Sequence, residues 1–317
     1  MTRLDADVTE TVARCLAEVG PVARLYPARE VPLGGVRGTS VQRTLPQRAL
    51  PMVGAWCFLD RFDDDREGMR VLPHPHIGLQ TVTWPLAGDV RHRDSVGSDV
   101  VVRPGQLNLM TAGRGIAHSE ISLDEPGSPM RGLQLWTALP SGALGIAPSF
   151  EQHTDLPRFH ADGLEATVLV GRLGDAASSA TTFSPLLGAD VLLAAGTDAT
   201  LPLDAGFEHA LLVIEGDVEV AGTRVGPGPL LYLGTRRTSI TLTSSAGARV
   251  MLLGGEPFGE EIVMWWNFVG RSHDEIVQAR EDWEARSDRF GHVAGHGDHR
   301  IPAPPLPHVR LAPRRRG

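Results

Sequence analysis

The stretch Thr81–Val90 reads TVTWPLAGDV, and it returns in shortened form as LLVIEGDV at Leu211–Val218. Each copy is a run of Val, Leu, Ile, Thr or Trp followed by Gly-Asp-Val, which is typical of a β-strand that enters a tight turn. A second turn follows both copies, with Pro104-Gly105 in the first and Gly226-Pro227-Gly228 in the second. Because a duplicated pattern indicates duplicated units, we expect two similar β-barrels in tandem.

The flanking sequence supports a mostly β protein. From about residue 31 the chain consists of short β-forming runs between turns, with 36 glycines and 24 prolines among 317 residues. This texture is typical of antiparallel sandwiches and barrels. Residues 7–19 show helical spacing, and Ser272 with Glu275 forms a capping box before a second amphipathic run that contains Ile276, Ala279 and Trp283. We predict an all-β fold with a few short flanking helices.

The composition excludes several function classes. All 30 residues in the Lys+Arg count are arginine, which removes phosphate loops, Schiff bases and cofactors that depend on a lysine. A net charge of -8 argues against direct nucleic-acid binding. The chain shows no secretory signal, no apolar run long enough for a membrane span and only two cysteines, so we expect a cytoplasmic protein. The 12 histidines become the candidates for chemistry.

Two histidine motifs belong to the first copy of the repeat. His74 and His76 are two residues apart before its strand, and His118 and Glu120 are two residues apart about forty residues later. Residues i and i+2 of a strand point to the same face, so the two pairs can converge into a set of three histidines and one carboxylate. Such a set suits divalent iron, nickel, copper, manganese or zinc. The alternative is a polar strand edge with a satisfied loop histidine.

The second copy provides an internal control. Aligning its Gly-Asp-Val with that of the first copy puts Pro202 and Asp204 where His74 and His76 stand. No His-x-Glu motif follows its second turn, and we interpret the lone His209 as structural. The second barrel is therefore expected to lack a comparable ligand set.

These segments together resemble the pirin family of two-cupin proteins. The resemblance extends from about residue 37 to the RIPAPPLP segment at 300–307, so it covers most of the chain. The matching text is VQRTLPQRAL (41–50), WCFLDRF (56–62), HPHIGLQTVTWPLAGDVRHRDSVG (74–97), MTAGRGIAHSE (110–120), GLQLW (132–136) and GGEPFGEEIVMWWNFV (254–269). The long histidine segment and MTAGRGIAHSE make the signal specific.

The resemblance implies two tandem jelly-roll cupins. We expect an N-terminal helical extension at 1–30, a metal-binding cupin at 31–150, a cupin without metal ligands at 151–270, and a C-terminal helix and tail at 271–317. The resemblance also implies the metal ligands, which would hold one divalent ion. We expect this ion to be Fe(2+), with nickel, copper, manganese or zinc as alternatives. These four ligands are His74, His76, His118 and Glu120.

Two further segments carry expectations. Gln80 occupies the position of a glutamate in the general cupin motif, and we expect it close to the metal. His92, Arg93, Asp94 and Ser95 match a pirin segment and either line the mouth of the pocket or form a salt-bridged turn, with no catalytic role assigned. The C-terminal histidines, namely His292, His296 and His299, are expected to be a polar tail.

The resemblance implies an iron-dependent dioxygenase that opens the ring of quercetin or a related flavonol and releases carbon monoxide. Glu120 would also act as the base for the flavonol hydroxyl. One alternative is a redox-sensing iron protein without enzymatic activity, which acts through a regulatory protein partner. Another is a metal-free bicupin with an unknown small ligand.

Overall fold

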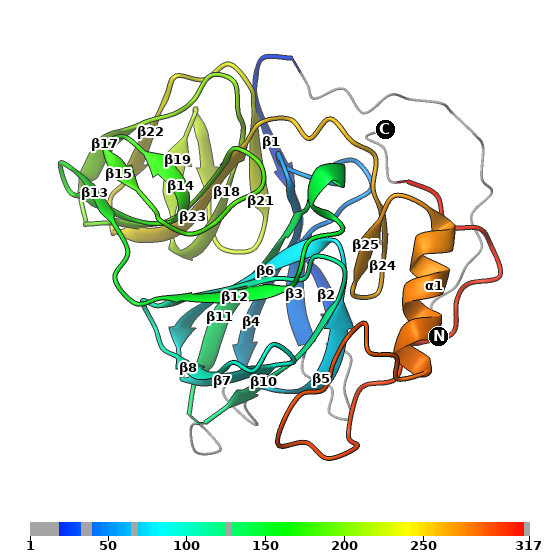
Figure 1. The fold of residues 1–317 in the computed structure, drawn as a ribbon. Coiled ribbons are helices and arrows are strands. Elements are labelled where there is room, and N and C mark those ends of the chain that lie inside the picture. Colours follow the sequence, from blue (N-terminus) through cyan, green and yellow to red (C-terminus); the bar gives the residue numbers. More distant parts are fainter. Residues whose placement is uncertain (1–18, 33–39, 65–68, 124–127, 314–317) are drawn as a thin grey trace.

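The computed structural model describes residues 19–32, 40–64, 69–123 and 128–313. These residues form two antiparallel β-barrels that lie side by side (Figure 1). One α-helix, α1 (His273–Glu284), and one 3-10 turn, η1 (Ser141–Ala143), complete the regular structure of the described residues. The predicted all-β fold with two tandem barrels is confirmed.

The first barrel closes between two antiparallel sheets. Its larger sheet has the order β12 (Ser149–His153), β9 (Leu107–Thr111), β6 (Leu79–Ala87), β11 (Met130–Ala138), β4 (Trp56–Asp64), β3 (Ser40–Leu45) and β2 (Arg29–Pro32). Its smaller sheet has the order β5 (Arg70–His76), β10 (Ile116–Ser122), β7 (Val90–Asp94) and β8 (Asp99–Val102).

The second barrel repeats this arrangement. Its larger sheet has the order β1 (Pro21–Tyr26), β21 (Leu230–Gly234), β18 (Glu208–Gly216), β23 (Ala248–Gly255), β16 (Leu186–Leu193), β14 (Leu164–Leu173) and β13 (Arg158–Ala161), and β15 (Ala176–Ala177) pairs with β14. Its smaller sheet has the order β17 (Thr197–Pro202), β22 (Ser239–Ser244), β19 (Val218–Val220) and β20 (Thr223–Val225).

The sequence repeat has a structural counterpart. Strands β6 and β18 occupy the same place in their sheets, and each is followed or ended by a glycine with positive φ, 83° at Gly88 and 71° at Gly216. The registers of their neighbours also match, so that β11 corresponds to β23, β4 to β16 and β3 to β14. The paired positions on these strands can therefore be compared between the two barrels.

The N-terminal segment differs from the expected helical extension. The predicted helix over residues 7–19 lies almost entirely outside the described residues. Pro21–Tyr26 form strand β1, which pairs with β21 of the second barrel, whereas β12 completes the first barrel's larger sheet. The free edge of β21 supplies the backbone hydrogen bonds that make this segment a strand.

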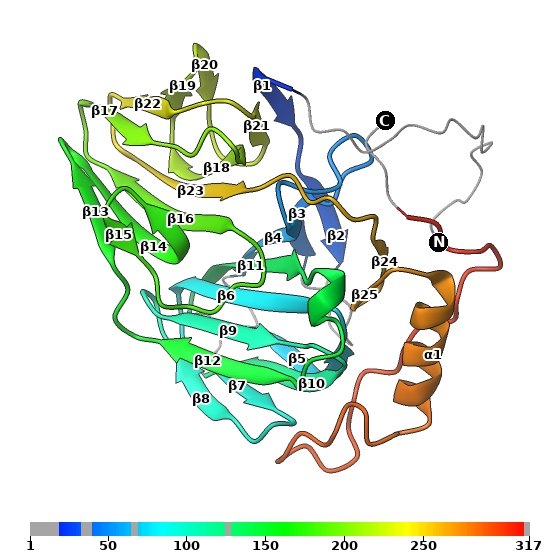
Figure 2. The ribbon, with the colours of Figure 1, turned by 45° about the horizontal axis from the view of Figure 1, so that its top comes forward.

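The larger sheets of the two barrels pack face to face (Figure 2). Leucines, valines and tryptophans from both sheets form one buried cluster between them. The indole nitrogen of Trp56 donates to carbonyl oxygens of the second barrel, at 3.2 Å to Leu187 and 3.1 Å to Gly254, and Trp84 donates to Asp190 at 2.9 Å. Burial of this apolar area, together with these bonds, holds the barrels as one unit.

The C-terminal segments cover one side of the first barrel (Figure 1). A hairpin of β24 (Val263–Trp265) and β25 (Phe268–Gly270) precedes α1. The N-cap half of the predicted capping box is present, because the Ser272 side chain accepts a hydrogen bond from the Glu275 amide. The Glu275 carboxylate accepts from the amide of Arg271, one residue before the N-cap, and the predicted apolar face of Ile276, Ala279 and Trp283 is buried. In the described part of the chain no helix is long and apolar enough to span a membrane.

Candidate metal centre

Strands β5 and β10 bring the three predicted histidine ligands together, whereas Glu120 forms a group with His118 and His92. His74 and His76 come from β5, and His118 and Glu120 come from the antiparallel neighbour β10. His118 lies directly opposite His74, so the three imidazoles meet on one side of this strand pair. The prolines at 73 and 75 are tolerated because β5 is an edge strand of its sheet.

The three histidines form a compact and buried cluster. One ligand nitrogen from each lies within 4.8 Å of the others, and each side chain is almost inaccessible to solvent. The Nε2 atoms of His76 and His118 are 3.0 Å apart. Two nitrogens bound to one ion at about 2.1 Å and at right angles are also about 3.0 Å apart, so this spacing fits a shared cation.

Hydrogen bonds to the other ring nitrogens assign the tautomers. Nδ1 of His74 is 2.9 Å from the carbonyl oxygen of Leu72, and Nδ1 of His76 is 3.1 Å from that of Asn267. A carbonyl oxygen only accepts hydrogen bonds, so Nδ1 of each ring carries the proton and Nε2 keeps its lone pair. Metal-binding histidines are usually fixed by an outer partner of this kind.

Burial keeps these imidazoles neutral. It lowers the pKa of His74 to about 4 and the pKa values of His76 and His118 well below their ordinary value. A neutral imidazole is the form that binds a metal, because protonation removes the lone pair. The cluster is therefore in its ligand form at neutral pH.

Glu120 is buried beside the histidines and lines the same cavity. Its Oε1 accepts a hydrogen bond of 2.8 Å from the Thr83 hydroxyl of β6, which leaves Oε2 for a metal or for a proton. Burial raises the pKa of the Glu120 carboxyl group. A carboxylate in such surroundings is stabilised by a nearby cation.

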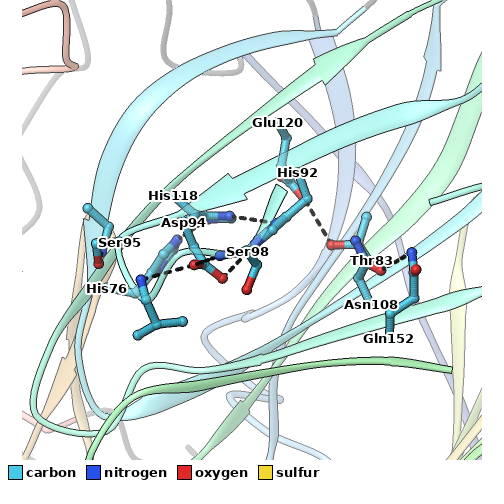
Figure 3. A network of polar contacts seen from close by, with 12 residues as sticks. His76, Thr83, His92, Asp94, Ser95, Ser98, Asn108, His118, Glu120 and Gln152 are labelled. Atoms are coloured by element: carbon cyan, nitrogen blue, oxygen red, sulfur yellow. Dashed lines mark hydrogen bonds and ion pairs between the residues drawn. The ribbon is translucent and has the colours of Figure 1, made fainter. Parts of the chain in front are cut away.

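His92 of β7 lies beside the cluster, whereas the sequence placed it only at the mouth of the pocket or in a salt-bridged turn. Figure 3 shows it beside His118 and Glu120, and these three residues form a second group with ligand atoms within 4.8 Å. Its Nε2 is 3.2 Å from the Asp94 carboxylate and its Nδ1 is 3.5 Å from Nδ1 of His118. The alternation of buried residues along Val90–Asp94 could have identified it.

Outer contacts also orient the third histidine. Nδ1 of His118 lies 3.5 Å from Nδ1 of His92, and Nε2 of His92 lies 3.2 Å from the Asp94 carboxylate. Three closely spaced, buried imidazoles with a buried carboxylate beside them form a donor set that fits a divalent metal.

The segment His92–Ser95 thus lies beside the histidine cluster rather than at the mouth of the pocket. Asp94 also accepts backbone hydrogen bonds from Val96 and Ser98, so it forms the expected turn. His296 is 2.8 Å from the Ser119 hydroxyl, on the strand between His118 and Glu120. The C-terminal segment therefore packs against the ligand strand instead of forming a separate polar tail.

Gln80 does not lie near the cluster, and that expectation is wrong. Its side-chain amide donates to Thr111 at 2.9 Å and to the Thr181 carbonyl oxygen of the second half of the chain at 3.0 Å. On β6 it shares a face with Val82 and Trp84, which belong to the core between the barrels, whereas Thr83 faces the cluster. Alternation along a strand places neighbours on opposite faces.

A cavity of about 430 Å³ opens beside the cluster. This volume is within the range of small-molecule pockets. Aromatic and aliphatic side chains make most of the wall, including the turn between β24 and β25. The polar wall residues in addition to the predicted ligands are Arg43, Asp60, Gln134 and Asn267.

The interior of the second barrel is different in kind. Leucine, valine, alanine and isoleucine side chains fill it as one buried cluster. His209 corresponds to Thr81 of the first barrel and is fully buried, and neither ring nitrogen has a hydrogen-bond partner in the part of the chain that the structure describes. Among the described residues, both groups that can hold a metal belong to the first barrel.

Comparison with known proteins gives a consistent result for both halves. The sequence model of the family described as Pirin matches residues 38–137, and that of the Pirin C-terminal cupin domain matches residues 188–291. A Pseudomonas aeruginosa protein named "Putative quercetin 2,3-dioxygenase" is 47% identical over 284 residues, which is 88% of this chain and 89% of that protein. Human "Pirin" is 30% identical and covers 80% of this chain and 89% of its own length.

Solved structures are similar over nearly the whole chain. The crystal structure of an Acinetobacter baumannii protein named quercetin 2,3-dioxygenase has a TM-score of 0.84 and 39% identity. The match covers 91% of this chain and 97% of that one. The arrangement of the two barrels is thus shared with that protein.

Proposed function

The chain belongs to the pirin family, and from this premise we propose that it is a metal-dependent dioxygenase that opens the ring of quercetin or a related flavonol. The observation that carries the proposal is the buried cluster of three imidazoles at the edge of the cavity, in which Nε2 of His76 and Nε2 of His118 are 3.0 Å apart. The names of the Pseudomonas and Acinetobacter relatives support the choice of substrate.

We assign the metal to His74, His76, His118 and Glu120, with Fe(2+) first and nickel, copper, manganese or zinc as alternatives. Three neutral imidazoles and a carboxylate suit these ions and leave positions for other ligands. When bound, the metal supplies Lewis acidity and electron exchange with dioxygen. The ligand positions themselves are kept in place by the outer hydrogen bonds to Leu72, Asn267 and His92.

The residues of the chain supply binding and proton transfer. Phe58, Trp136 and Trp265 line the cavity with aromatic surface that suits a planar substrate and excludes water. Glu120 would accept the proton of the flavonol 3-hydroxyl at Oε2 when that oxygen is released from the metal, because Oε1 is already engaged by Thr83. Its raised pKa makes it a stronger base than an exposed carboxylate.

The test is aerobic turnover of quercetin by the iron-loaded protein, followed through the loss of flavonol absorbance and the release of carbon monoxide. We expect turnover in the wild type and none in a His74→Ala, His118→Ala double variant. A matched His209→Thr variant removes a buried histidine of the other barrel and retains turnover.

Two results would count against the proposal. Turnover that persists in the His74→Ala, His118→Ala variant excludes the assigned site. Absence of turnover in a wild type that carries stoichiometric metal excludes the dioxygenase and favours the regulatory alternative.

A further inference from the structure

An arginine–carboxylate pair lies inside the first barrel, on the wall of the cavity. Nε and Nη2 of Arg43 each donate to one oxygen of Asp60 at 2.7 Å. The Asp60 side chain is 2% exposed and that of Arg43 is 23% exposed. Arg43 is the one arginine among the residues that line this cavity in the described chain.

The fold does not require this pair. By register, Arg43 corresponds to Val168 and Asp60 to Ala189 in the second barrel, and both of these lie in the aliphatic cluster that fills that barrel. Replacement of buried ion pairs by apolar residues is often neutral or stabilising. A charged pair kept at a position where the same fold accepts valine and alanine therefore indicates a binding role.

The guanidinium group is fixed in orientation. Its carbon lies 4.4 Å from the centre of the Phe58 ring, and Phe58 stacks on Trp136 with 3.9 Å between centroids. Two nitrogens of the Arg43 guanidinium group donate to Asp60, and Nη1 has no partner among the described residues. The exposed part of Arg43 is thus a rigid donor, since the cation–π contact and the two-bond pair restrain it.

Arg43 and the proposed metal ligands are at opposite ends of the cavity wall. Arg43, Asp60, Gln134 and Thr83 are directly opposed neighbours on four adjacent strands, and Thr83 binds Glu120. Three strand spacings correspond to about 14 Å along the curved sheet. On a second path, two stacked rings, Phe58 and Trp136, separate Arg43 from His76.

We propose that Arg43 determines the substrate specificity of this site by binding a phenolic oxygen on the part of an aromatic substrate remote from the reacting ring. The proposal rests on the proposed function and narrows its substrate class to flavonols that carry hydroxyl groups on their outer rings. Such a compound is long and planar, so its reacting end can lie beside Glu120 while its outer hydroxyl accepts a hydrogen bond from Nη1 of Arg43.

The test measures binding without turnover. Anaerobic titrations of the metal-loaded protein use quercetin, which has outer hydroxyl groups, and 3-hydroxyflavone, which has the same skeleton without them. Binding is followed through the quenching of tryptophan fluorescence, because Trp136, Trp265 and Trp266 line the cavity. The key variant is Arg43→Met with Asp60→Asn, which removes both charges and leaves no buried carboxylate unpaired.

We expect this double variant to weaken quercetin binding about tenfold, which corresponds to the loss of one charge-assisted hydrogen bond. The affinity for 3-hydroxyflavone should stay within about twofold of the wild-type value. Arg43→Lys keeps the charge and alters the barrel least. We expect its affinity for quercetin to lie between those of the wild type and the double variant, and its affinity for 3-hydroxyflavone to be unchanged. The matched control is Arg91→Met with Asp99→Asn, which removes an exposed pair with the same two-bond geometry and changes neither affinity.

The outcomes separate this proposal from the proposed function. Suppose that the wild type binds both flavonols. If the Arg43 variants then weaken the affinity for quercetin and for 3-hydroxyflavone equally, or change neither affinity, the assignment of Arg43 is overturned and the flavonol site stands. If the wild type binds neither flavonol, the proposed function and the inference fail together. Unfolding midpoints of all variants show whether a loss of binding reflects a loss of fold.

Discussion

The two barrels share one backbone plan and differ in what fills them. Five buried or cavity-lining polar positions of the first barrel have aliphatic counterparts in the cluster that fills the second. The pairs are Arg43 and Val168, Asp60 and Ala189, Thr83 and Leu211, His92 and Val220, and Gln134 and Leu252.

This difference separates the requirements of the fold from those of the site. The second barrel shows that leucine, valine and alanine at these positions satisfy the fold, because apolar packing stabilises it without hydrogen-bond partners. The polar interior of the first barrel costs desolvation free energy and is retained only where its groups pair with one another or with a ligand.

The largest expected effect is the loss of metal from the first barrel. His76→Leu replaces one proposed ligand by an aliphatic side chain of the kind that fills the second barrel. We expect metal affinity to fall at least about hundredfold, which is more than the loss of a hydrogen-bond partner of a ligand would cause. Metal analysis after purification without chelator measures the change. His209→Thr is the matched control and should keep the wild-type stoichiometry. Full metal content in His76→Leu would contradict the ligand assignment.

The second effect concerns the buried histidine of the second barrel. Burial lowers the pKa of His209 from 6.5 to about 4. The unfolded chain therefore binds a proton at this imidazole below about pH 6.5, whereas the folded protein does so only below about pH 4, so stability falls as the pH is lowered through this window. His209→Thr introduces the residue of the first barrel.

Denaturant unfolding of wild type and His209→Thr at pH 7 and pH 4.5 measures this linkage. We expect the wild type to lose about 2 kcal/mol more of its free energy of unfolding than the variant between these two pH values, from a shift of this size. Equal losses in the two proteins would show that His209 has a partner in solution.

The third effect tests the outer partner of His118. His92→Val places the residue of the second barrel opposite Glu120 and removes the polar partner of Nδ1 of His118. We expect metal affinity, measured by competition with a chelator, to fall about 10- to 100-fold. His92→Gln retains an amide that can hydrogen-bond to His118 and should recover part of the loss. Equal affinities in the valine and glutamine variants would exclude this role.

The smallest expected effect distinguishes the two faces of β6. Gln80→Leu removes hydrogen bonds to Thr111 and Thr181 on the side of the other barrel, and we expect a loss of about 1 kcal/mol in the free energy of unfolding. Metal affinity should stay within about twofold of the wild type, because the side chain points away from the cluster. A marked loss of metal would restore the earlier expectation for Gln80.

Much of the fold and of the site follows from local patterns. The repeat identified two barrels, the capping box identified α1, and the i, i+2 spacing of His74 with His76 and of His118 with Glu120 placed each pair on one face. The prediction for Gln80 was wrong because a motif position was used without the alternation along β6. The place of His92 beside the cluster was not predicted, because its partners come from another strand and from a turn.

The sequence by itself determined the strands, the duplication and the candidate histidine pairs, because these depend on periodicity, turn residues and donor chemistry within short segments. Only the tertiary structure decided that β1 joins the second barrel, that Gln80 faces the other barrel, and that Arg43 lies in the wall of the cavity. These features depend on which strands pair and in what register. Strand pairing is set by contacts between residues far apart in the chain, and local sequence does not encode them.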